Sequence, residues 1–528
     1  MSQTPSEQYE TIMSLLADRT ASKGDSPLVH TAERVYSYRD IHEDSNAIAN
    51  KLVEQGVEPG DQICTFLENS PEYIAVWFGI AKAGGVMVSL NADLREDGLA
   101  YVLRDSSAST IVLDTSTREN YETIRGDEND IETEFLLGEA PPGADYRPFE
   151  ELLDADRTSP PDRSRRGSDP LSNIYTSGTT GKPKGVILPH YSYINTGQEF
   201  VDRMLSIGPD DRLFTTLPLS HCNAQQITVT GSILAATDFV LYPEFDPDRY
   251  WDQIRRHDAT VFNYLGTMIT NLHNTDEQPD DAENPAKYGI GAGAPSKVID
   301  EFERRFDLQL VEGYGLTETA TTAAINPMDA PRHGSIGKPL SYTEIEIVDD
   351  QDQPLPPGEE GEIVVRPTKP NSFMLGYHNK PQETVDAWQN LWFHTGDIGY
   401  KDEDGYFYFV DRKVYAIRRP GGNVSSYEVE SVLSDHPALK EDAVFGVPDE
   451  HGNEAVKAVV VPKPDRNPTP VDVVSYCDGK LAYYKVPRFV EIRDELPKTT
   501  TERVKKYELM GESNHDAWDR EKGYELKR

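Results

Sequence analysis

The first 110 residues alternate between two spacings of apolar positions. Helical spacing, with apolar residues three or four apart, runs from Tyr38 to Gln55 and ends at Gly56. Shorter apolar runs, which are typical of buried strands, separate further helical stretches. The expected order after the first helix is strand 62–67, helix 71–83, strand 86–90, helix 96–106 and strand 110–113. Strands that alternate with helices predict βαβ units around a mainly parallel sheet.

The alternation returns after residue 210 and later changes character. We expect strand 212–217, helix 246–257, strand 261–264, a glycine-rich strand end at 289–295 and a strand at 308–313. Residues 140–170 are rich in Pro, Asp, Arg and Ser, and we expect a long surface loop there. From Gly334 onwards, short strands at 344–348, 361–366, 392–400 and 406–410 predict a small β-barrel-like unit.

A compact α/β segment follows Asp411 and Arg412. Its pattern predicts helix 426–434 and strands 442–447 and 455–461. We therefore expect an α/β protein with a large N-terminal domain, residues 1–411, built from two βαβ-type subdomains and the small β-barrel. A small α/β C-terminal domain, residues 412–528, completes it. The length of 528 residues fits this division, because it is too long for a single core.

The charge of the chain narrows the choice of partners. There are 52 Lys and Arg against 91 Asp and Glu, so the formal net charge at pH 7 is −39. Such an excess argues against binding to nucleic acid or to an anionic membrane surface. Because the acidic residues are spread along the chain, we interpret them as a solvation adaptation of the halophilic kind. An ordinary acidic bacterial protein is the alternative.

The cysteines and the apolar stretches indicate the cellular compartment in which the protein works. Cys64, Cys222 and Cys477 lie far apart and form no disulfide framework or zinc-binding spacing, which suits a reducing compartment. Residues 1–10 lack the apolar core of a signal peptide. The longest apolar stretch, residues 73–90, is broken by a lysine and two glycines and is too mixed to span a bilayer. We expect a soluble cytoplasmic protein with no membrane insertion.

One run carries an unusual density of glycine, hydroxyl and lysine residues. Residues 175–186 have the sequence YTSGTTGKPKGV, between two apolar stretches that predict strands. The glycines let backbone N–H groups approach an anion, the hydroxyls add donors, and Lys182 and Lys184 add charge, which together make a phosphate cradle. It is not a Walker A loop, because only two residues separate Gly178 from Gly181. A polar glycine-rich turn without a ligand is the alternative.

This run resembles the signature loop of the AMP-forming acyl-CoA synthetases. They belong to the adenylate-forming superfamily, with firefly luciferase and the adenylation domains of peptide synthetases. Later motifs match in the family's order, with YGLTE at 314–318, HTGD at 394–397 and PKTTTER at 497–503, so the resemblance covers nearly the whole chain. Within the family, the chain is most similar to the small-acid ligases near crotonobetaine/carnitine-CoA ligase.

The resemblance implies the cofactors and the partners. ATP, Mg²⁺ and CoA would bind, the substrate would be a small-molecule carboxylic acid, and the C-terminal domain would be mobile. A homodimer is left open.

The resemblance also assigns a nucleotide site. Phosphate would be bound at Thr176, Ser177, Gly178, Thr179, Thr180 and Gly181, with Lys182 and Lys184 as catalytic charges. Thr317 would bind phosphate as well, and Glu318 would hold Mg²⁺, a hard cation that prefers oxygen ligands. Adenine would lie against Gly293, Ala294, Pro295, Tyr314 and Gly315, and ribose against Asp397 and Arg412. Each segment alone has a structural alternative, as a helix-starting turn, a packed strand end or a glycine-containing turn.

By the same resemblance, the acyl pocket is expected around His221, Tyr264, Gly291 and Gly315. His221 matches the residue that gates the pocket towards the pantetheine tunnel, and a hydrogen-bonded histidine at a strand end is the alternative. Acetate-specific relatives carry a bulky Trp directly after the Tyr of the YxxTE motif. Gly315 stands there, so we expect a pocket for a larger acid, which a Gly315→Trp change would narrow towards acetate.

The C-terminal domain matches the family less closely. The loop that resembles the thioester site offers candidate CoA-binding residues at Arg418, Arg419, Gly421 and Gly422, and a solvated basic turn is the alternative. Arg503 stands at the position of the family's catalytic lysine. Val414 and Tyr415 stand where the hinge is usually polar, and Gly422 stands where Glu is common. The adenylate-binding half thus matches the family, whereas the domain rotation and the thioester half depart from it.

The sequence therefore predicts an acid–CoA ligase. It would form acyl-AMP and pyrophosphate from a carboxylate and ATP, and then transfer the acyl group to CoA, with Arg503 among the residues that offset charge. An adenylate-binding protein with weak turnover is one alternative, which the altered hinge and Arg503 favour. An adenylation enzyme that serves a separate carrier protein is another, because no carrier segment precedes Arg528.

Overall fold

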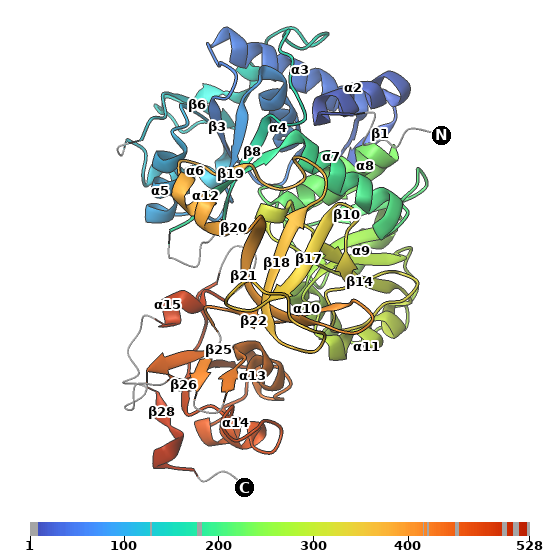
Figure 1. Ribbon diagram of the computed structural model, residues 1–528. Coiled ribbons are helices and arrows are strands. Elements are labelled where there is room, and N and C mark those ends of the chain that lie inside the picture. The colour runs from blue at the N-terminus through green and yellow to red at the C-terminus, as the bar shows by residue number, and fades with distance from the viewer. Residues whose placement is uncertain are drawn as a thin grey trace. The chain divides into compact units, whose positions relative to one another are not determined.

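The computed structural model describes residues 9–126, 129–176, 182–415, 417–419, 422–448, 454–498, 504–510 and 517–524 (Figure 1). The chain forms two compact units. The larger comprises residues 1–178, 182–345 and 365–393, and the smaller comprises residues 346–364 and 394–528. A large α/β part and a smaller C-terminal part agree with the predicted fold class.

An eight-stranded sheet lies at the centre of one half of the larger unit. Its order is β19-β9-β8-β4-β3-β5-β6-β7, with β3 (Gln62–Phe66), β4 (Val86–Ser89), β5 (Thr110–Asp114), β6 (Thr133–Leu137), β7 (Arg147–Pro148), β8 (Pro170–Thr176), β9 (Lys184–Pro189) and β19 (Gly376–Tyr377). The strands from β8 to β7 are parallel to their neighbours, while β9 is antiparallel to both β8 and β19. The strands predicted before residue 115 are confirmed to within one residue.

A nine-stranded sheet forms the other half. Its order is β16-β15-β14-β13-β12-β10-β11-β1-β2, with β1 (Pro27–His30), β2 (Val35–Ser37), β10 (Arg212–Thr215), β11 (Asp238–Leu241), β12 (Val261–Leu265), β13 (Tyr288–Ala292), β14 (Gln309–Tyr314), β15 (Ala324–Ile325) and β16 (Lys338–Pro339). The pairs from β14 through β12, β10 and β11 to β1 are parallel. Parallel strands point their carboxyl ends to one edge, so the residues that follow β12, β13 and β14 become neighbours.

The helices of the larger unit lie before, between and after the strands of these sheets along the chain (Figure 1). They are α2 (Ile12–Lys23), α3 (Tyr38–Glu54), α4 (Pro71–Ala83), α5 (Glu96–Ser106), α6 (Thr115–Glu122), α7 (His190–Glu199), α8 (Gly231–Ala235), α9 (Tyr250–Arg256), α10 (Gly266–His273), α11 (Ser296–Phe306) and α12 (Pro381–Ala387). Short 3₁₀ helices lie at η1 (Phe149–Leu153) and η4 (Thr317–Thr319), and π-helical turns at η2 (Phe200–Met204) and η3 (Ala224–Thr230).

Local signals set the bounds of α4, which match the prediction at both ends. Ser70 accepts a hydrogen bond from the backbone N–H of Tyr73 at 3.1 Å, and Pro71 fits the first helical turn. Gly84 ends the helix with φ +89°. The neighbouring helix α3 packs so closely that a Cβ on Gly79 would lie 2.6 Å from the Ile48 side chain.

Two predicted segments differ from the structure. Residues 140–170 are not one long surface loop, because they contain β7 and η1, and the side chains of Phe149 and Leu152 are buried. These two apolar residues sit among Pro and charged residues, so the composition of the segment concealed them. The predicted helix 246–257 is shorter than expected, since α9 begins at Tyr250.

The short strands after residue 340 form a five-stranded sheet. They are β17 (Thr343–Val348), β18 (Gly361–Pro367), β20 (Trp388–Gln389), β21 (Trp392–Lys401) and β22 (Phe407–Arg412). Their order is β17-β18-β21-β20, and β22 also pairs with β21. Among the described residues this path is open, so the unit is a branched sheet where the sequence predicted a β-barrel.

A four-stranded sheet, order β25-β26-β27-β28, organises the rest of the smaller unit. Its elements are the hairpin β23 (Ile417–Arg419) and β24 (Gly422–Val424), α13 (Ser426–Leu433), β25 (Leu439–Pro448), β26 (Glu454–Pro462), α14 (Pro470–Cys477), β27 (Phe489–Ile492), α15 (Lys506–Met510), β28 (Trp518–Asp519) and η6 (Arg520–Lys522). Buried valines of β25, β26 and α14 form its core. The predicted helix and both predicted strands are confirmed.

In the part of the chain that the structure describes, no helix combines the length and the apolar character that crossing a bilayer needs.

Candidate active site

Two antiparallel strands carry the ends of the predicted phosphate cradle. β8 ends at Thr176 and β9 begins at Lys184, and these two residues lie opposite each other in the register. The predicted order of strand, loop and strand is confirmed at both flanks. Ser177, Gly178, Thr179, Thr180 and Gly181 lie outside the described residues.

Lys184 and Glu318 are brought together by Tyr377. Because β19 pairs with β9, Tyr377 lies next to the strand that begins at Lys184. The Tyr377 hydroxyl donates to Glu318 Oε1 at 2.9 Å, and the backbone N–H of Met374 donates to the backbone oxygen of Glu318 at 2.9 Å. Lys184 Nζ lies 4.8 Å from the Tyr377 ring centroid and 2.9 Å from Glu383 Oε2. Lys184, which follows the predicted cradle, and Glu318 of the YGLTE motif therefore contact the same tyrosine.

The electrostatics of Tyr377 keep it a donor. Burial, followed by the charge of Glu318, raises the pKa of Tyr377, so its hydroxyl stays protonated. The bond fixes one oxygen of the Glu318 carboxylate and thereby its orientation. Glu318 is partly exposed and offers oxygen, the ligand type that Mg²⁺ prefers. This carboxylate fits the metal position that the sequence predicts.

Lys182 lies beside a second cluster, on α5. Its Nζ is 5.5 Å from the ring centroid of Tyr101. One turn further along α5, Asp105 accepts hydrogen bonds from Tyr175 at 2.8 Å and from Lys380 at 2.7 Å. Burial raises the pKa of Asp105, but the bonds from Lys380 and Tyr175 outweigh it and lower the pKa below its ordinary value. Asp105 therefore stays charged and anchors β8 to α5 next to the cradle.

The segment that carries His221 lies beside Thr317. Cys222 Sγ is 3.9 Å from Thr317 Oγ1, and burial raises the pKa of the Cys222 thiol. His221 Nε2 is 3.5 Å from the side-chain nitrogen of Asn91, which follows β4. The backbone oxygen of Ser220 accepts a bond from Ser89 at 3.1 Å. The candidate gate residue thus lies where the two sheets of the larger unit meet, next to Thr317.

A partly buried carboxylate joins the ends of β12, β13 and β14. Glu312 accepts hydrogen bonds from the Tyr264 hydroxyl and from the backbone N–H groups of Gly293, at 3.0 Å, and Ala294, at 3.2 Å. Burial raises the pKa of Glu312, and the three donors act in the opposite direction. Gly291 permits this arrangement, since a Cβ there would lie 2.2 Å from the backbone oxygen of Tyr264. Glu312 therefore holds the backbone of the predicted adenine segment in place.

Gly315 does not have the surroundings that the sequence led us to expect. A Cβ at this position would lie 2.1 Å from the backbone oxygen of Thr321 and 2.7 Å from the Cα of Thr322. A side chain would therefore meet backbone, not open space, and a tryptophan would require the chain at 321–322 to move. The expectation that Gly315→Trp simply fills an acyl pocket is wrong for this backbone. The neighbouring Tyr314 is 9% exposed.

In the smaller unit, the two predicted ribose residues contact each other. Asp397 on β21 and Arg412 on β22 are opposite in the register, and Arg412 Nε lies 3.2 Å from Asp397 Oδ1. The Asp397 side chain is only 3% exposed, so the ion pair is well shielded from water. Next to it, Asp411 accepts a hydrogen bond from the Ser426 hydroxyl at 3.2 Å, which links β22 to α13.

The C-terminal motifs are described in part. Arg418, Arg419 and Gly422 lie in the hairpin β23–β24, while Gly421 and Arg503 lie outside the described residues. Lys506 stands three positions after Arg503. Its Nζ forms an ion pair with Glu430 Oε1 at 2.6 Å and donates a hydrogen bond to Ser426 Oγ at 2.8 Å. It also lies 5.1 Å from the ring centroid of Tyr415. Lys506 therefore connects α15 to α13 and to the segment after β22.

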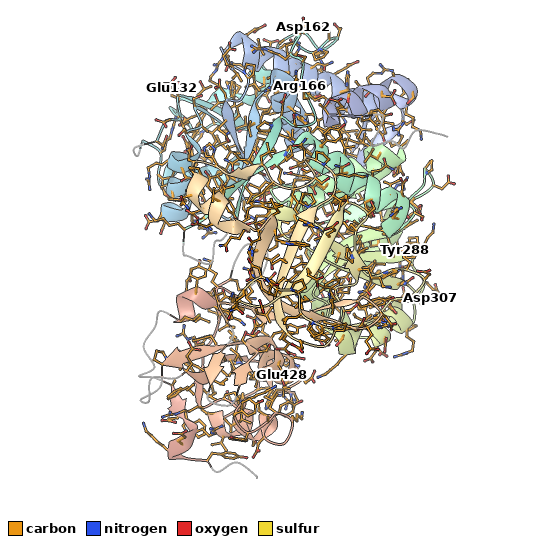
Figure 2. All side chains as sticks on the ribbon, in the orientation of Figure 1. Glu132, Asp162, Arg166, Tyr288, Asp307 and Glu428 are labelled. Atoms are coloured by element: carbon orange, nitrogen blue, oxygen red, sulfur yellow. The ribbon has the colours of Figure 1, made fainter. Side chains whose placement is uncertain are left out.

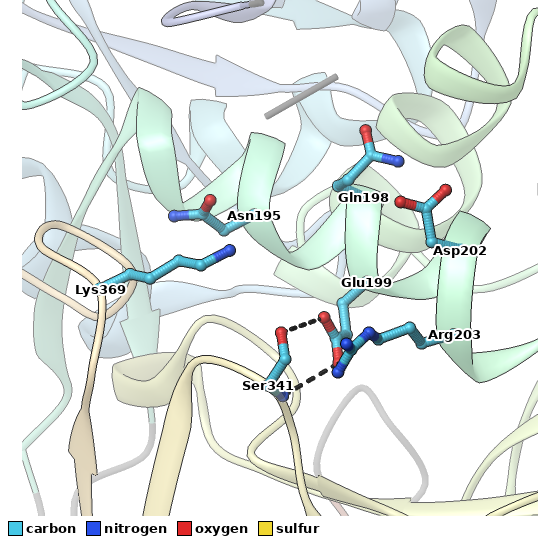
Figure 3. Close-up of a pocket in the computed structure, with 7 residues that line it drawn as sticks. All are labelled: Asn195, Gln198, Glu199, Asp202, Arg203, Ser341 and Lys369. Carbon is cyan, nitrogen blue, oxygen red and sulfur yellow. Dashed lines mark hydrogen bonds and ion pairs between the residues drawn. The ribbon is translucent and has the colours of Figure 1, made fainter. Parts of the chain in front are cut away.

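A small polar pocket of about 130 Å³ lies elsewhere in the larger unit (Figure 3). It is lined by Asn195, Gln198, Glu199, Asp202, Arg203, Ser341 and Lys369. Glu199 accepts bonds from the Ser341 hydroxyl at 2.6 Å and from its backbone N–H at 3.0 Å, and Arg203 lies 4.0 Å away. None of the residues predicted for the nucleotide site lines this pocket.

Sequence analysis missed three residues of the site. Glu312, Cys222 and Tyr377 act through contacts with segments far away in the chain, and none stands in a motif that signals phosphate or metal binding. Of the three, Glu312 gives the clearest signal in the sequence, since it is an acidic residue that interrupts an apolar strand two positions before Tyr314.

Comparison with known proteins agrees with this geometry. A model of the AMP-binding enzyme family matches residues 16–378, and a model of the AMP-binding enzyme C-terminal domain matches residues 428–503. Crotonobetaine/carnitine–CoA ligase of Salmonella choleraesuis (strain SC-B67) is 34% identical over 486 residues, which cover 90% of this chain and 93% of that protein. The enzyme of the same name from Salmonella typhi is 33% identical over 513 residues, 95% of this chain and 98% of that protein.

Solved structures show the same relation. The anthranilate CoA ligase AuaEII in complex with anthranoyl-AMP has a TM-score of 0.86 and 27% identity, covering 94% of this chain and 96% of that one. ATP-bound MatB from Rhodopseudomonas palustris has a TM-score of 0.83 and 29% identity, covering 94% and 98%. The chain therefore belongs to the AMP-binding enzyme family and, within it, to the adenylate-forming acid–CoA ligases.

Proposed function

We propose that the larger unit binds MgATP between the phosphate cradle and the YGLTE motif. The observation that carries this proposal is the junction at Tyr377, which holds Glu318 and Lys184 beside each other. A metal carboxylate and a cationic side chain are what a triphosphate needs at one place. The acid then attacks the α-phosphorus, and pyrophosphate leaves.

In this proposal the protein acts mainly by positioning and by offsetting charge. Lys182 and Lys184 neutralise phosphate oxygens, together with the hydroxyl and N–H donors of residues 176–181. Thr317 binds phosphate, and Glu318 holds Mg²⁺, which supplies a charge that withdraws electrons from the phosphates. Tyr377 acts as a positioning residue, because its hydroxyl donates to Glu318 and fixes that carboxylate.

Glu312 has a separate role in the proposal. Its carboxylate holds the N–H groups of Gly293 and Ala294, and so sets the conformation of the strand end against which adenine and the acyl group bind, with Pro295 and Tyr314. The Tyr264 hydroxyl is already bonded to Glu312, so Tyr264 contributes its ring to the acyl pocket. His221 and Gly291 complete that pocket, and His221 gates it.

The smaller unit carries the remaining residues. Asp397 and Arg412 bind ribose, and their ion pair keeps the Asp397 carboxylate oriented when no nucleotide is bound. We place the boundary of a mobile C-terminal domain at Arg412. Arg503 serves adenylation in place of the family's lysine, and Arg418, Arg419, Gly421 and Gly422 serve CoA in the thioester step.

The acid is a small carboxylate. Two relatives that span nearly the whole chain are crotonobetaine/carnitine–CoA ligases, so trimethylammonium acids are the first substrates to test. A sharp comparison is 4-(trimethylammonio)butanoate against 5,5-dimethylhexanoate, its uncharged isostere, with benzoate and acetate in the same panel. A preference for the charged acid supports this class, and equal rates contradict it.

We also propose that the protein works in a reducing, salt-rich cytoplasm. The three cysteines are buried free thiols. Acidic side chains such as Glu132, Asp162 and Asp307 lie exposed over the larger unit (Figure 2). Their mutual repulsion weakens as salt screens it.

Glu318→Gln tests the metal carboxylate. Removal of its charge is expected to slow ATP–pyrophosphate exchange by about 10²–10³-fold, because one charge-stabilising contact is lost. Glu119→Gln, an exposed change on α6, is the control and keeps the wild-type rate. Exchange within threefold of wild type in folded Glu318→Gln protein would remove Glu318 from the site.

Arg503→Ala and Lys506→Ala separate two roles in the C-terminal motif. Arg503→Ala is expected to slow acyl-AMP formation by about 10²–10³-fold while thioester formation from supplied acyl-AMP survives. Lys506→Ala instead leaves Glu430 without its cation and lowers the free energy of unfolding by about 1–3 kcal/mol, with adenylation retained. The opposite pattern, in which Lys506→Ala alone stops adenylation, contradicts both assignments.

The halophilic proposal predicts a strong dependence of stability on salt. The melting temperature is expected to rise by many degrees between dilute buffer and molar KCl, because salt screens the repulsion between carboxylates. An uncharged osmolyte at matched osmolarity is the control and reproduces only a small part of the rise. Equal melting temperatures in dilute buffer and in molar KCl would contradict this proposal.

A further inference from the structure

Three side chains that could hold a metal ion converge on the larger unit, outside the residues of the nucleotide site. Asp300 and Glu303 are three residues apart on one face of α11, and His333 lies in the segment between β15 and β16. His333 Nε2 is 3.3 Å from Asp300 Oδ1 and 3.9 Å from Glu303 Oε2. All three ligand atoms lie within 4.8 Å of one another.

The structure holds the Glu303 side chain and the backbone around His333 in place before any ion arrives. The other oxygen of Glu303 accepts a hydrogen bond from the backbone N–H of Leu310 at 2.8 Å, which leaves Oε2 on the side of His333. Asn326 pins the segment around His333: its Oδ1 accepts from the N–H of Arg332 at 3.0 Å, and its amide donates to the backbone oxygen of Ser335 at 2.8 Å. An ion would therefore have to order few groups on binding, so the entropic cost of binding is small.

The site is open to solvent on one side. The side chain of Glu303 is 22% exposed, that of His333 is 30% exposed and that of Asp300 is 82% exposed. Asp300 can therefore rotate to close the site, and water can complete the coordination. An imidazole and two carboxylates bound at about 2.0–2.2 Å lie roughly 3–3.5 Å from one another. The His333–Asp300 separation of 3.3 Å lies in this range, and the His333–Glu303 separation of 3.9 Å lies above it, so a bound ion would draw these side chains closer.

We propose that Asp300, Glu303 and His333 form a binding site for a divalent transition-metal ion of the Zn²⁺ class. Imidazole nitrogen favours Zn²⁺, Ni²⁺ and Co²⁺ over Mg²⁺, which prefers oxygen ligands and keeps its water. The site is thereby distinct in chemistry from the Mg²⁺ position at Glu318. The competing explanation is an ion pair between protonated His333 and the two carboxylates, with no metal.

The position of the site gives the ion a structural effect. α11 begins directly after Pro295, the end of the strand-end segment that Glu312 braces. An ion shared by α11 and His333 would tie that helix to the β15–β16 segment. Binding should therefore stabilise the larger unit against unfolding.

The test uses tag-free protein stripped with a chelator and contains no ATP or acid, so it is independent of ligase activity. Zn²⁺ is titrated in competition with a chromophoric chelator, and Co²⁺ is titrated by its visible absorption. Wild-type protein is expected to bind one equivalent of either ion at this site and to melt at a higher temperature when Zn²⁺ is bound. Millimolar Mg²⁺ should not displace it.

His333→Gln and Glu303→Gln identify the ligands. Each is expected to weaken Zn²⁺ binding at least tenfold and to abolish the rise in melting temperature. In Glu303→Gln, the amide oxygen of the new side chain can still accept the bond from the N–H of Leu310, so the local fold is kept. The matched control is His273→Gln. His273, at the end of α10, lies 3.7 Å from one carboxylate, that of Glu301, which is on α11 like Asp300 and Glu303. No Co²⁺ absorption in wild type, or unchanged Zn²⁺ affinity in His333→Gln, leaves only the ion pair and overturns the proposal.

Discussion

The hydrogen bond from Tyr377 to Glu318 is the contact on which the arrangement of the site depends. It exists because β19 adds to the free side of β9, and β9 begins at the end of the phosphate cradle. The pairing places a tyrosine from after residue 370 against a carboxylate from before residue 320. Burial and the charge of Glu318 raise the pKa of this phenol, so it remains a hydrogen-bond donor, and the carboxylate that accepts from it is fixed in orientation.

Partly buried carboxylates occur at the other junctions and act in a similar way. Glu312 gathers the ends of three strands, Asp105 joins β8 to α5, and Glu430 holds Lys506 against α13. Each accepts from charged or N–H donors, which offset the cost of removing a carboxylate from water. Each of these three carboxylates joins segments that lie apart in the chain.

The sequence predicted features that depend on neighbouring residues. The bounds of α4 can be predicted because Ser70, Pro71 and Gly84 are local signals, and the cradle can be recognised because its glycines, hydroxyl residues and lysines stand in one short run. It could not predict Tyr377, whose role depends on strand pairing between distant segments. It also failed at Gly315, since the direction of a missing side chain is a property of the backbone at 321–322, and at Phe149, whose burial the surrounding polar residues hid.

A double-mutant cycle on ATP–pyrophosphate exchange tests the central claim, that Tyr377 acts by positioning Glu318. The four proteins are wild type, Tyr377→Phe, Glu318→Gln and the double variant. Tyr377→Phe alone should slow exchange by about tenfold or more, the effect of losing one bond to a charged group. In the Glu318→Gln background the same change should have almost no further effect. Equal effects of Tyr377→Phe in both backgrounds would contradict the account.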